Sequence, residues 1–537
     1  MLNKADTIFF NGSVITVDEH QAVAEAIAIK NNKILEVGTN YEIEKYRKSS
    51  TEVIDLKGNS LMPGIIDPHV HLTISGINLL DLNCQTENVS SLDALFTMIG
   101  KEAIKTVPGN WIRVWAFNEN DMKEQRFPTL AELDKVAPEH PLVIVRVCNH
   151  TSMTNTQGLL AAGINKSTKN PEGGIIERDS LGSLTGIFLE NAHMQLSTVF
   201  AHEEEELIAA LALASKYFLG YGITSVHDAG GYGDGNVILK AMKKSIETKG
   251  IQLRIYAMIG SLTDSESFID AIMESDVKTG DGDEWLKIGP AKLFTDGSST
   301  GPTIGTREGY TSDKNNKGVL YYQQGELNEC LGKAHELGFQ ITAHAQGDRA
   351  VEMMLNCIEN ALIKHPRLNH RHRIEHAGIA PEDLQIRMKE LDVIPIPNPA
   401  FIYMNGESYV KNYGDRVNKM YPVRDYIDKG IIAPIASDAP VVGVNPFLGI
   451  HAAVNRLSRE GNGVGTDQSI SLMQGIEAYT KHAAYASFDE DVKGSLKPGM
   501  LADLIVLDRN IFKAPIEEIK DIQVELTMID GEIVFER

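Results

Sequence analysis

From residue 222 onward, short apolar runs alternate with stretches of helical periodicity. Successive runs start about 20 to 53 residues apart, which is the spacing of strand–helix units that build a parallel sheet. The runs are 222–226, 253–259, 286–294, 339–343, 373–375, 393–397 and 431–436. The helices expected between them are 236–248, 265–275, 325–337, 350–363 and 381–391. With an earlier run at 61–68, these would be eight parallel strands, which close a (β/α)8 TIM-like barrel.

The two ends of the chain carry a different pattern, in which short strands flank tight turns. Asn11-Gly12 is a strong hairpin signal, and further pairs of short strands flank turns at Asn31-Asn32, Lys57-Gly58 and Asp530-Gly531. Neither end holds enough strands for an independent sheet with a buried face. We therefore expect residues 1–62 and 497–537 to form one small composite β-sandwich, and residues 63–496 to form the barrel.

Residues 72–215 do not follow the barrel rhythm. They lie between the first and second expected barrel strands and carry candidate strands of their own at 111–117 and 142–147. Long loops on the carboxyl-terminal face of a barrel line the active site. We therefore expect this insertion to shape the substrate pocket.

Composition and charge narrow the class of protein. Of the 537 residues, 42% are hydrophobic and 23% are charged, which is typical of globular proteins and excludes disordered and fibrous ones. The net charge is −22, with 73 acidic residues against 51 Lys and Arg, which argues against binding to nucleic acid or anionic membranes. The four cysteines are scattered, and neither a basic leader nor an apolar stretch of roughly 18 residues is present. These features predict a cytoplasmic enzyme with a small-molecule substrate.

Potential metal ligands stand at the ends of most expected barrel strands. His69 and His71 follow the first strand, and residues i and i+2 point to the same side of a strand, so they can chelate one ion. The other candidates, each at the end of its own strand, are Lys292, His344, His376 and Asp438. Because the carboxyl ends of parallel strands converge at one mouth of a barrel, the set predicts a metal centre there.

Each of these signals has a simpler interpretation when taken alone. A single histidine is more often structural than a ligand, a lysine is usually solvated, and an aspartate at a strand end often caps a helix. The full set in this order is hard to obtain through packing alone, which favours the metal centre. Arg373 and Glu375 precede His376, and strand alternation is expected to turn them away from it into a salt bridge in the barrel wall.

The chain contains the segments LMPGIIDPHVHL, KLFTDGS, HAQGDRA, HRIEHAG, SDAPV and KPGMLADLIVLD. Together with the split sandwich, they resemble the amidohydrolase superfamily, and within it the branch that includes N-substituted formamide deformylases. The resemblance covers nearly the whole chain and implies a distorted (β/α)8 barrel with one or two divalent ions. The chain departs from the pattern at Ala436, where glycine is frequent, and at Asn398, where glutamine is common before the proline.

The resemblance implies a role for each candidate ligand. His69 and His71 would bind the more buried ion, and His344 and His376 the more exposed one. Asp438 would contact the attacking water and act first as a base and then as an acid.

Lys292 would carry a carboxylated amine. An ammonium group cannot bind a cation, whereas a carbamate offers two anionic oxygens that can bridge two ions. The alternative is an ordinary amine that donates to the substrate or to Asp296 beside a single metal. Imidazole and carboxylate donors without thiolate suit Zn²⁺, with Mn²⁺, Fe²⁺ and Co²⁺ as alternatives.

The expected reaction is metal-dependent hydrolysis of a non-peptide C–N bond in an amide or formamide. We expect His150, Glu190, Trp115 and Asn398 to contact the substrate, with His150 also catalytic as a possible oxyanion donor. Two alternatives stay open: an esterase, lactonase or carbamate hydrolase with the same metal centre, and a catalytically silent metal-binding sensory protein. A homodimer is expected only because the chain resembles the superfamily.

Overall fold

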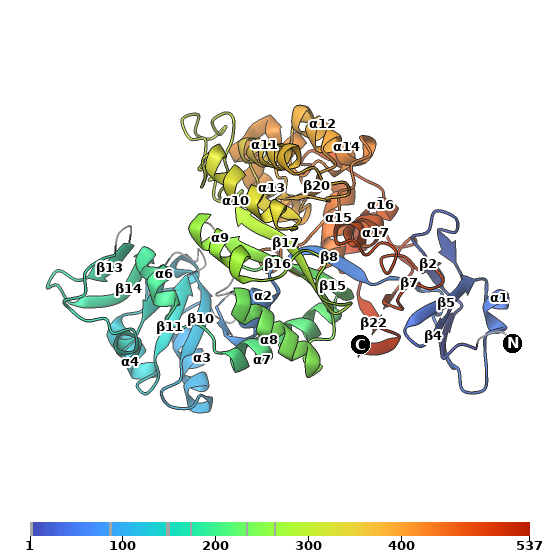
Figure 1. The fold of residues 1–537 in the computed structure, drawn as a ribbon. Helices are drawn as coiled ribbons and strands as arrows, with labels where there is room; N and C mark the ends of the chain where they lie inside the picture. Colours follow the sequence, from blue (N-terminus) through green and yellow to red (C-terminus); the bar gives the residue numbers. More distant parts are fainter. Residues whose placement is uncertain (1–3, 85–88, 147–150, 172–173, 232–234, 263–264) are drawn as a thin grey trace. The chain divides into compact units, whose positions relative to one another are not determined.

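The computed structural model describes residues 4–84, 89–146, 151–171, 174–231, 235–262 and 265–537 (Figure 1). The chain folds as two compact units. Unit 1 comprises Met1–Leu72 and Ala214–Arg537, and unit 2 comprises Thr73–Leu213. The boundaries fall at the start of α2 (Leu72–Leu80) and inside α7 (Glu204–Leu219). Unit 2 therefore packs largely on itself.

The centre of unit 1 is a nearly closed, seven-stranded parallel sheet. Its strand order is β20-β19-β18-β17-β16-β15-β8, and all neighbouring strands are parallel. The strands are β8 (Ile65–Val70), β15 (Ile223–Asp228), β16 (Arg254–Leu262), β17 (Leu286–Phe294), β18 (Ile341–Ala345), β19 (Arg373–His376) and β20 (Ile394–Ile396). Each strand overlaps one of the apolar runs, so these seven predictions are confirmed.

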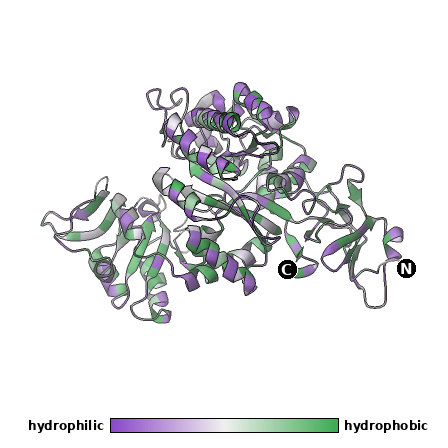
Figure 2. Ribbon diagram, in the orientation of Figure 1, coloured by the Kyte–Doolittle hydropathy of each residue, from purple (hydrophilic) through white to green (hydrophobic). Residues whose placement is uncertain are grey.

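Helices follow these strands along the chain, as the rhythm predicts. They include α8 (Gly235–Glu247), α9 (Ser265–Glu274), α10 (Gln324–Glu336), α11 (Asp348–Lys364) and α12 (Glu382–Glu390). In α11 the buried residues Val351, Met354, Leu355 and Ile358 recur at helical spacing and join the core that contains Ile341 of β18. Figure 2 shows hydrophobic and hydrophilic residues mixed on these helices. Among the described residues, no helix has both the length and the apolar character needed to cross a membrane.

The expected eighth strand, Ile431–Ala436, does not form a strand ladder. The backbone N–H of its last residue donates to Pro397 O at 3.1 Å, and Asp438 N–H donates to His69 O at 2.9 Å. The segment thus connects β20 and β8 by isolated hydrogen bonds. Pro434 has no N–H to donate, so one of the hydrogen bonds that a ladder would use is absent here.

The first expected barrel strand, 61–68, is divided between two sheets. Its first part lies in β7 (Ser60–Pro63), which belongs to a sheet formed by the chain ends, and the rest lies in β8. The division falls at Gly64, where a Cβ atom would lie 2.2 Å from the Thr224 side chain. This close approach lets the chain pass from one sheet to the other beside β15.

The two chain ends combine in two further sheets. The strand orders are β5-β4-β1-β6 and β23-β22-β21-β7-β2-β3. Their bounds are β1 (Thr7–Phe10), β2 (Ser13–Ile15), β3 (Val23–Ala24), β4 (Ala26–Lys30), β5 (Lys33–Gly38), β6 (Glu52–Asp55), β21 (Leu504–Leu507), β22 (Val524–Ile529) and β23 (Glu532–Glu536). Strands from opposite ends of the sequence are direct neighbours, since β7 pairs with β21.

The four expected turns differ in the strands that they connect. The turns at 31–32 and 530–531 close hairpins, since β4 pairs with β5 and β22 pairs with β23. The hairpin expected at 11–12 is wrong, because β1 and β2 belong to different sheets, and the turn expected at 57–58 likewise leads from β6 to β7 in another sheet. At Gly12 a Cβ atom would lie 2.3 Å from the Leu56 side chain, so the two crossings pack tightly against each other. The turn residues predict a change of direction but not the sheet in which the next strand pairs.

Unit 2 contains a six-stranded sheet of order β13-β14-β12-β11-β10-β9. Its strands are β9 (Leu82–Asn83), β10 (Ile112–Phe117), β11 (Leu142–Arg146), β12 (Thr151–Thr154), β13 (Gly174–Arg178) and β14 (Leu184–Glu190). The strands expected at 111–117 and 142–147 correspond to β10 and β11. Helix α3 (Leu92–Lys105) begins at Ser91, whose side chain accepts from Ala94 N–H, and its Leu95 packs in one core with Val114 of β10.

Three buried histidines form a hydrogen-bonded cluster in unit 1. His372 Nδ1 accepts from Ile341 N–H at 3.1 Å, so its Nε2 carries the proton and donates to His335 Nδ1 at 2.9 Å. His335 Nε2 in turn donates to His365 O at 2.7 Å, and His370 Nδ1 accepts from His372 N–H at 2.9 Å. An added proton on any of these accepting nitrogens would break a hydrogen bond, so the folded chain holds the three rings neutral.

This cluster predicts a loss of stability in mild acid. Burial holds the pKa of His372 well below its usual value, whereas the unfolded chain takes up the proton near pH 6.5. The free energy of unfolding therefore falls as the pH drops below about 6.5, because only the unfolded state gains the proton. In His372→Gln, urea unfolding should show a shallower dependence on pH between 7.5 and 5.5, by up to about 1.4 kcal/mol per pH unit. The exposed His20, changed to Gln, is the matched control, and an unchanged slope in His372→Gln would contradict the prediction.

Candidate metal centre

The expected metal ligands gather at the carboxyl ends of the barrel strands. His69 lies in β8, His71 just after it, Lys292 in β17, His344 in β18, His376 at the end of β19, and Asp438 in the segment that follows Ala436. All of them come from unit 1. Their role as ligands stays a prediction, and their geometry shows what such a centre could hold.

The tightest group consists of His69, His71 and Asp438. One potential ligand atom from each residue lies within 4.8 Å of the other two. Asp438 Oδ1 is 3.4 Å from His69 Nε2 and 3.3 Å from His71 Nε2. This buried oxygen makes no hydrogen bond with the described residues. A buried oxygen in that state is costly unless another group, such as a cation, satisfies it.

Contacts on the far side of each ring decide which nitrogen carries the proton. His69 Nδ1 lies 2.5 Å from Glu375 Oε2, and His71 Nδ1 lies 2.6 Å from Gly230 O. A carboxylate and a carbonyl both accept hydrogen bonds, so each Nδ1 donates and each Nε2 keeps a lone pair. Both lone pairs thus face the carboxylate of Asp438, an arrangement that repels itself in the absence of a cation.

Two further imidazoles adjoin this group. The His376 ring lies 4.8 Å from the His69 ring and 4.6 Å from the His344 ring, centroid to centroid. His376 Nδ1 lies 2.7 Å from Asn398 Oδ1, and His344 Nε2 lies 2.9 Å from Gly297 O. In each ring one nitrogen is engaged by the protein, which leaves His376 Nε2 and His344 Nδ1 as the nitrogens suited to a metal.

Lys292 lies beside the same group. It is fully buried, its Nζ donates to Ala229 O at 3.2 Å, and it lies 3.5 Å from His69 Nε2. Burial lowers the pKa of Lys292 to about 8, so a neutral amine is accessible near neutral pH. Asp296, the alternative partner of this lysine, accepts three backbone N–H groups of neighbouring loops.

Asp438 stays ionised in these surroundings. Burial alone would raise its pKa, but in the metal-free chain the attraction of the His71, His376 and His69 rings, when these carry a proton, outweighs burial and holds the pKa of Asp438 below its usual range. Its backbone φ of +62° and that of His376, +69°, are in the left-handed region, which is uncommon for residues other than glycine. A set of imidazoles and one ionised carboxylate without thiolate fits a divalent metal ion.

Sequence reasoning missed the role of Glu375. Its salt bridge with Arg373 is confirmed, with Arg373 Nε 2.8 Å from Glu375 Oε1. Glu375 nevertheless does not turn away from the centre, because it contacts His69. The left-handed backbone at His376 interrupts the alternation of β19, so Glu375 and His376 both reach the neighbourhood of His69. In the sequence, this role could be suspected only from the position of Glu375 directly before the candidate ligand His376.

The structure also shows where the expected substrate-contacting residues lie. Asn398 is fully buried and uses its amide on His376 and on Ala436 O, so here it orients a ring. Trp115 lies in β10 of unit 2 and donates from Nε1 to Asn78 O at 3.0 Å. Glu190 ends β14 in the same unit, exposed and with a φ of +53°. His150 lies outside the described residues.

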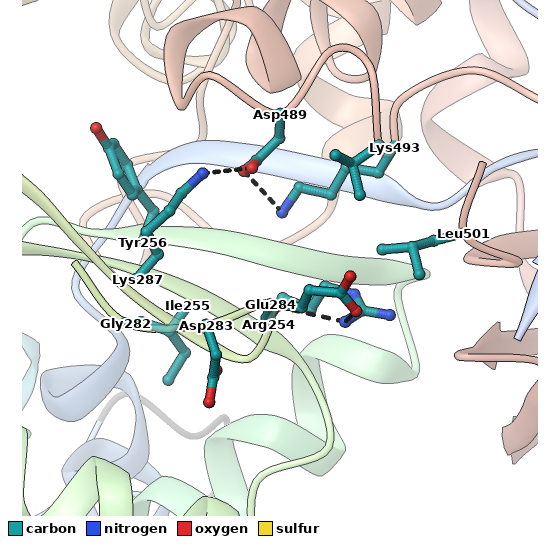
Figure 3. Close-up of a pocket in the computed structure, with 11 residues that line it drawn as sticks. Arg254, Ile255, Tyr256, Gly282, Asp283, Glu284, Lys287, Asp489, Lys493 and Leu501 are labelled. Carbon is teal, nitrogen blue, oxygen red and sulfur yellow. Dashed lines mark hydrogen bonds and ion pairs between the residues drawn. The ribbon is translucent and has the colours of Figure 1, made fainter. Parts of the chain in front are cut away.

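A cavity of about 240 Å³ lies at the opposite, amino end of β16 and β17 (Figure 3). Asp489 pairs there with Lys287 and, at 3.4 Å, with Lys493. Arg254 pairs with Asp503, next to β21, at 2.7 Å. These cations therefore have carboxylate partners, and the pair of Arg254 with Asp503 links β16 to the chain next to β21.

Comparisons with known proteins agree with this geometry. Residues 52–535 match the amidohydrolase family. YtcJ of Bacillus subtilis (strain 168) is 30% identical over 542 residues, which cover 99% of each chain. N-substituted formamide deformylase of Arthrobacter pascens is 28% identical over 554 residues, which cover 100% of this chain and 99% of that one. The crystal structure of an uncharacterized metal-dependent hydrolase from Pyrococcus horikoshii OT3 has a TM-score of 0.79 at 24% identity and covers 95% of this chain and 99% of its own, which shows a shared fold.

The geometry predicts that a divalent ion stabilises the folded chain. A ligand that binds only the folded state at about 100 times its dissociation constant adds roughly 2.7 kcal/mol to the free energy of unfolding. Zn²⁺ or Co²⁺ should therefore raise the melting temperature of metal-free protein, and His71→Ala should lose most of this shift. Differential scanning calorimetry with and without metal measures the effect, with His20→Ala as the control. Equal shifts in wild type and His71→Ala would contradict it.

Proposed function

The chain belongs to the amidohydrolase family, and on that premise we propose that it is a metal-dependent hydrolase that cleaves an amide or formamide C–N bond of a small molecule. The observation that carries the proposal is the buried group of His69, His71 and Asp438, in which two nitrogen lone pairs face a carboxylate oxygen. A silent binding protein has no need of an ionised carboxylate at that position, which disfavours the sensory alternative.

The chain's own residues divide the chemistry between them. A divalent ion bound by these imidazoles supplies Lewis-acid chemistry, lowering the pKa of water to about 7 and polarising a carbonyl. Asp438 is ionised and accepts a proton from the attacking water at Oδ1. It then returns this proton to the nitrogen that leaves, so the amine departs neutral. His344 and His376 would bind the more exposed ion.

We further propose that Lys292 reacts with carbon dioxide. The neutral amine attacks the carbon of CO₂, a C–N bond forms and one proton is released, which leaves a carbamate with two anionic oxygens. The lowered pKa of Lys292 supports this step, because only the unprotonated amine is a nucleophile. The carbamate would hold two ions together, whereas a free amine would fit a single ion.

The finer assignments remain parts of the proposal. Zn²⁺ suits the nitrogen and oxygen donors best, ahead of Mn²⁺, Fe²⁺ and Co²⁺. Substrate contacts are proposed for His150, Glu190 and Trp115 in the 72–215 insertion. The two sheets of the chain ends are proposed to act as one β-sandwich, since Phe9 and Val14 from different sheets share a core. A cytoplasmic location and a homodimer remain expectations.

A substrate panel tests the reaction. Metal-free protein, prepared with dipicolinate, should be inactive, and Zn²⁺ should restore hydrolysis of N-formyl amines or amides. Faster turnover of matched esters, lactones or carbamates would replace the C–N bond assignment with the alternative hydrolase. Absence of turnover on the whole panel by a metal-loaded chain would favour the sensory protein.

The proposed role of Asp438 predicts a loss of catalytic turnover without a loss of the fold. Asp438→Asn should keep the fold and lower kcat by about 100- to 10,000-fold, the contribution typical of a general acid–base residue. Metal content by plasma mass spectrometry and kcat with the best substrate of the panel measure the effect. Asp489→Asn at the far end of the barrel is the matched control and should retain kcat. Wild-type turnover in Asp438→Asn would remove the proposed role.

The carbamate has its own test. Protein equilibrated with ¹³C-bicarbonate should show a carbamate carbon resonance by NMR, which Lys292→Met abolishes. Lys493 is also buried with a pKa lowered by burial, so Lys493→Met is the matched control and should retain the signal. A wild-type spectrum without the resonance, or its loss only in Lys493→Met, would contradict carboxylation of Lys292.

A further inference from the structure

We propose that Glu375 is a positioning residue for the metal centre, which fixes the ring and the proton of His69, and that Arg373 holds Glu375 in place for this task. This inference rests on the proposed function, since it concerns how the same centre binds its metal. It concerns residues that do not themselves face the ion.

The contacts of Glu375 leave it a single role toward His69. The residue is fully buried. Oε2 lies 2.5 Å from His69 Nδ1, while Oε1 accepts from Thr342 Oγ1 at 2.7 Å and from Arg373 Nε at 2.8 Å. With donors on both oxygens, the carboxylate accepts from His69 Nδ1–H. The ring proton is thereby placed on Nδ1, and the lone pair of Nε2 points toward Asp438.

Arg373 ties this carboxylate to two other strands. Its Nη2 donates to Pro68 O at 2.6 Å in β8, the strand that carries His69, and also to Glu375 Oε2 at 2.9 Å. Its Nη1 donates to His227 Nδ1 at 2.8 Å in β15. The guanidinium thus keeps the position of Glu375 relative to His69 constant and supplies the opposite charge that a buried carboxylate needs.

Stability alone is a weak reason for this ion pair. Removing two charges from water costs about as much as their attraction returns, so apolar residues would often serve a barrel wall equally well. A charged acceptor on the outer nitrogen of a ligating imidazole has a separate effect, since it fixes the tautomer and increases the basicity of the inner nitrogen. The direct contact between Glu375 and His69 therefore favours a role in metal binding.

The test measures the affinity of the full-length, metal-free chain for Zn²⁺ alone by competition with a chromophoric chelator. Glu375→Gln keeps an oxygen that can accept a hydrogen bond but loses the charge, and should weaken binding about 10- to 100-fold. The absorption spectrum of the Co²⁺ form should change as well, since it reports the geometry around the metal. Asp489→Asn, which removes a buried ion-paired carboxylate at the other end of the strands, should match wild type in both measurements.

The outcomes separate the possibilities. If Glu375→Gln lowers the melting temperature of metal-free protein but leaves Zn²⁺ affinity and the Co²⁺ spectrum unchanged, the residue is structural and the inference is overturned. If Glu375→Gln does not fold, Thr342→Val decides, because it removes one donor to Glu375 without altering a charge: a weaker affinity supports the inference and an unchanged one overturns it. A wild-type chain that binds no Zn²⁺ would overturn the proposed function itself, whereas tight binding by wild type and variants alike would overturn only the role of Glu375.

Discussion

Repulsion among buried hydrogen-bond acceptors is the constraint around which the barrel mouth is built. The inner nitrogens of His69 and His71 both face Asp438 Oδ1 within 3.4 Å, and their outer nitrogens are already bound to acceptors. Such a group is relieved only when it takes up positive charge, either as a proton on one of the rings or as a metal ion. The surrounding strands must supply the free energy that keeps it together, and a cation would return much of that cost on binding.

The barrel strands separate two functions along their length: the proposed metal binding at their carboxyl ends and structural ion pairs at their amino ends. At the carboxyl ends, charges are left partly uncompensated around Lys292 and Asp438. At the amino ends, Arg254 and Lys493 are each matched by a carboxylate, and the pair of Arg254 with Asp503 attaches the barrel to the terminal sheet. Lys287 and Lys292 both lie in β17, five residues apart, or roughly 16 Å at about 3.3 Å per residue. The same strand therefore contributes one lysine to the ion pairs at its amino end and one to the candidate metal centre at its carboxyl end.

Much of this arrangement could be predicted from the sequence, because a parallel barrel places strand ends together and apolar runs mark the strands. His69, His344 and His376 were found in this way. The contact of Glu375 with His69 could not be predicted, since regular alternation would turn only one of Glu375 and His376 toward His69, and no residue type announces the left-handed backbone at His376. The segment expected as the eighth strand makes only isolated hydrogen bonds, and the hairpin expected at 11–12 does not form, because turn residues do not specify the sheet in which the next strand pairs.

The pairing of β7 with β21 has a consequence for biosynthesis. β7 ends at Pro63 and β21 begins at Leu504, so a ribosome must add more than four hundred residues before the first strand meets its neighbour. Until β21 has been synthesised, one edge of the amino-terminal strands lacks its partner and is open to association with other nascent chains. Only a chain that includes β21 can close that edge, so products terminated before residue 504 would keep an unpaired strand exposed.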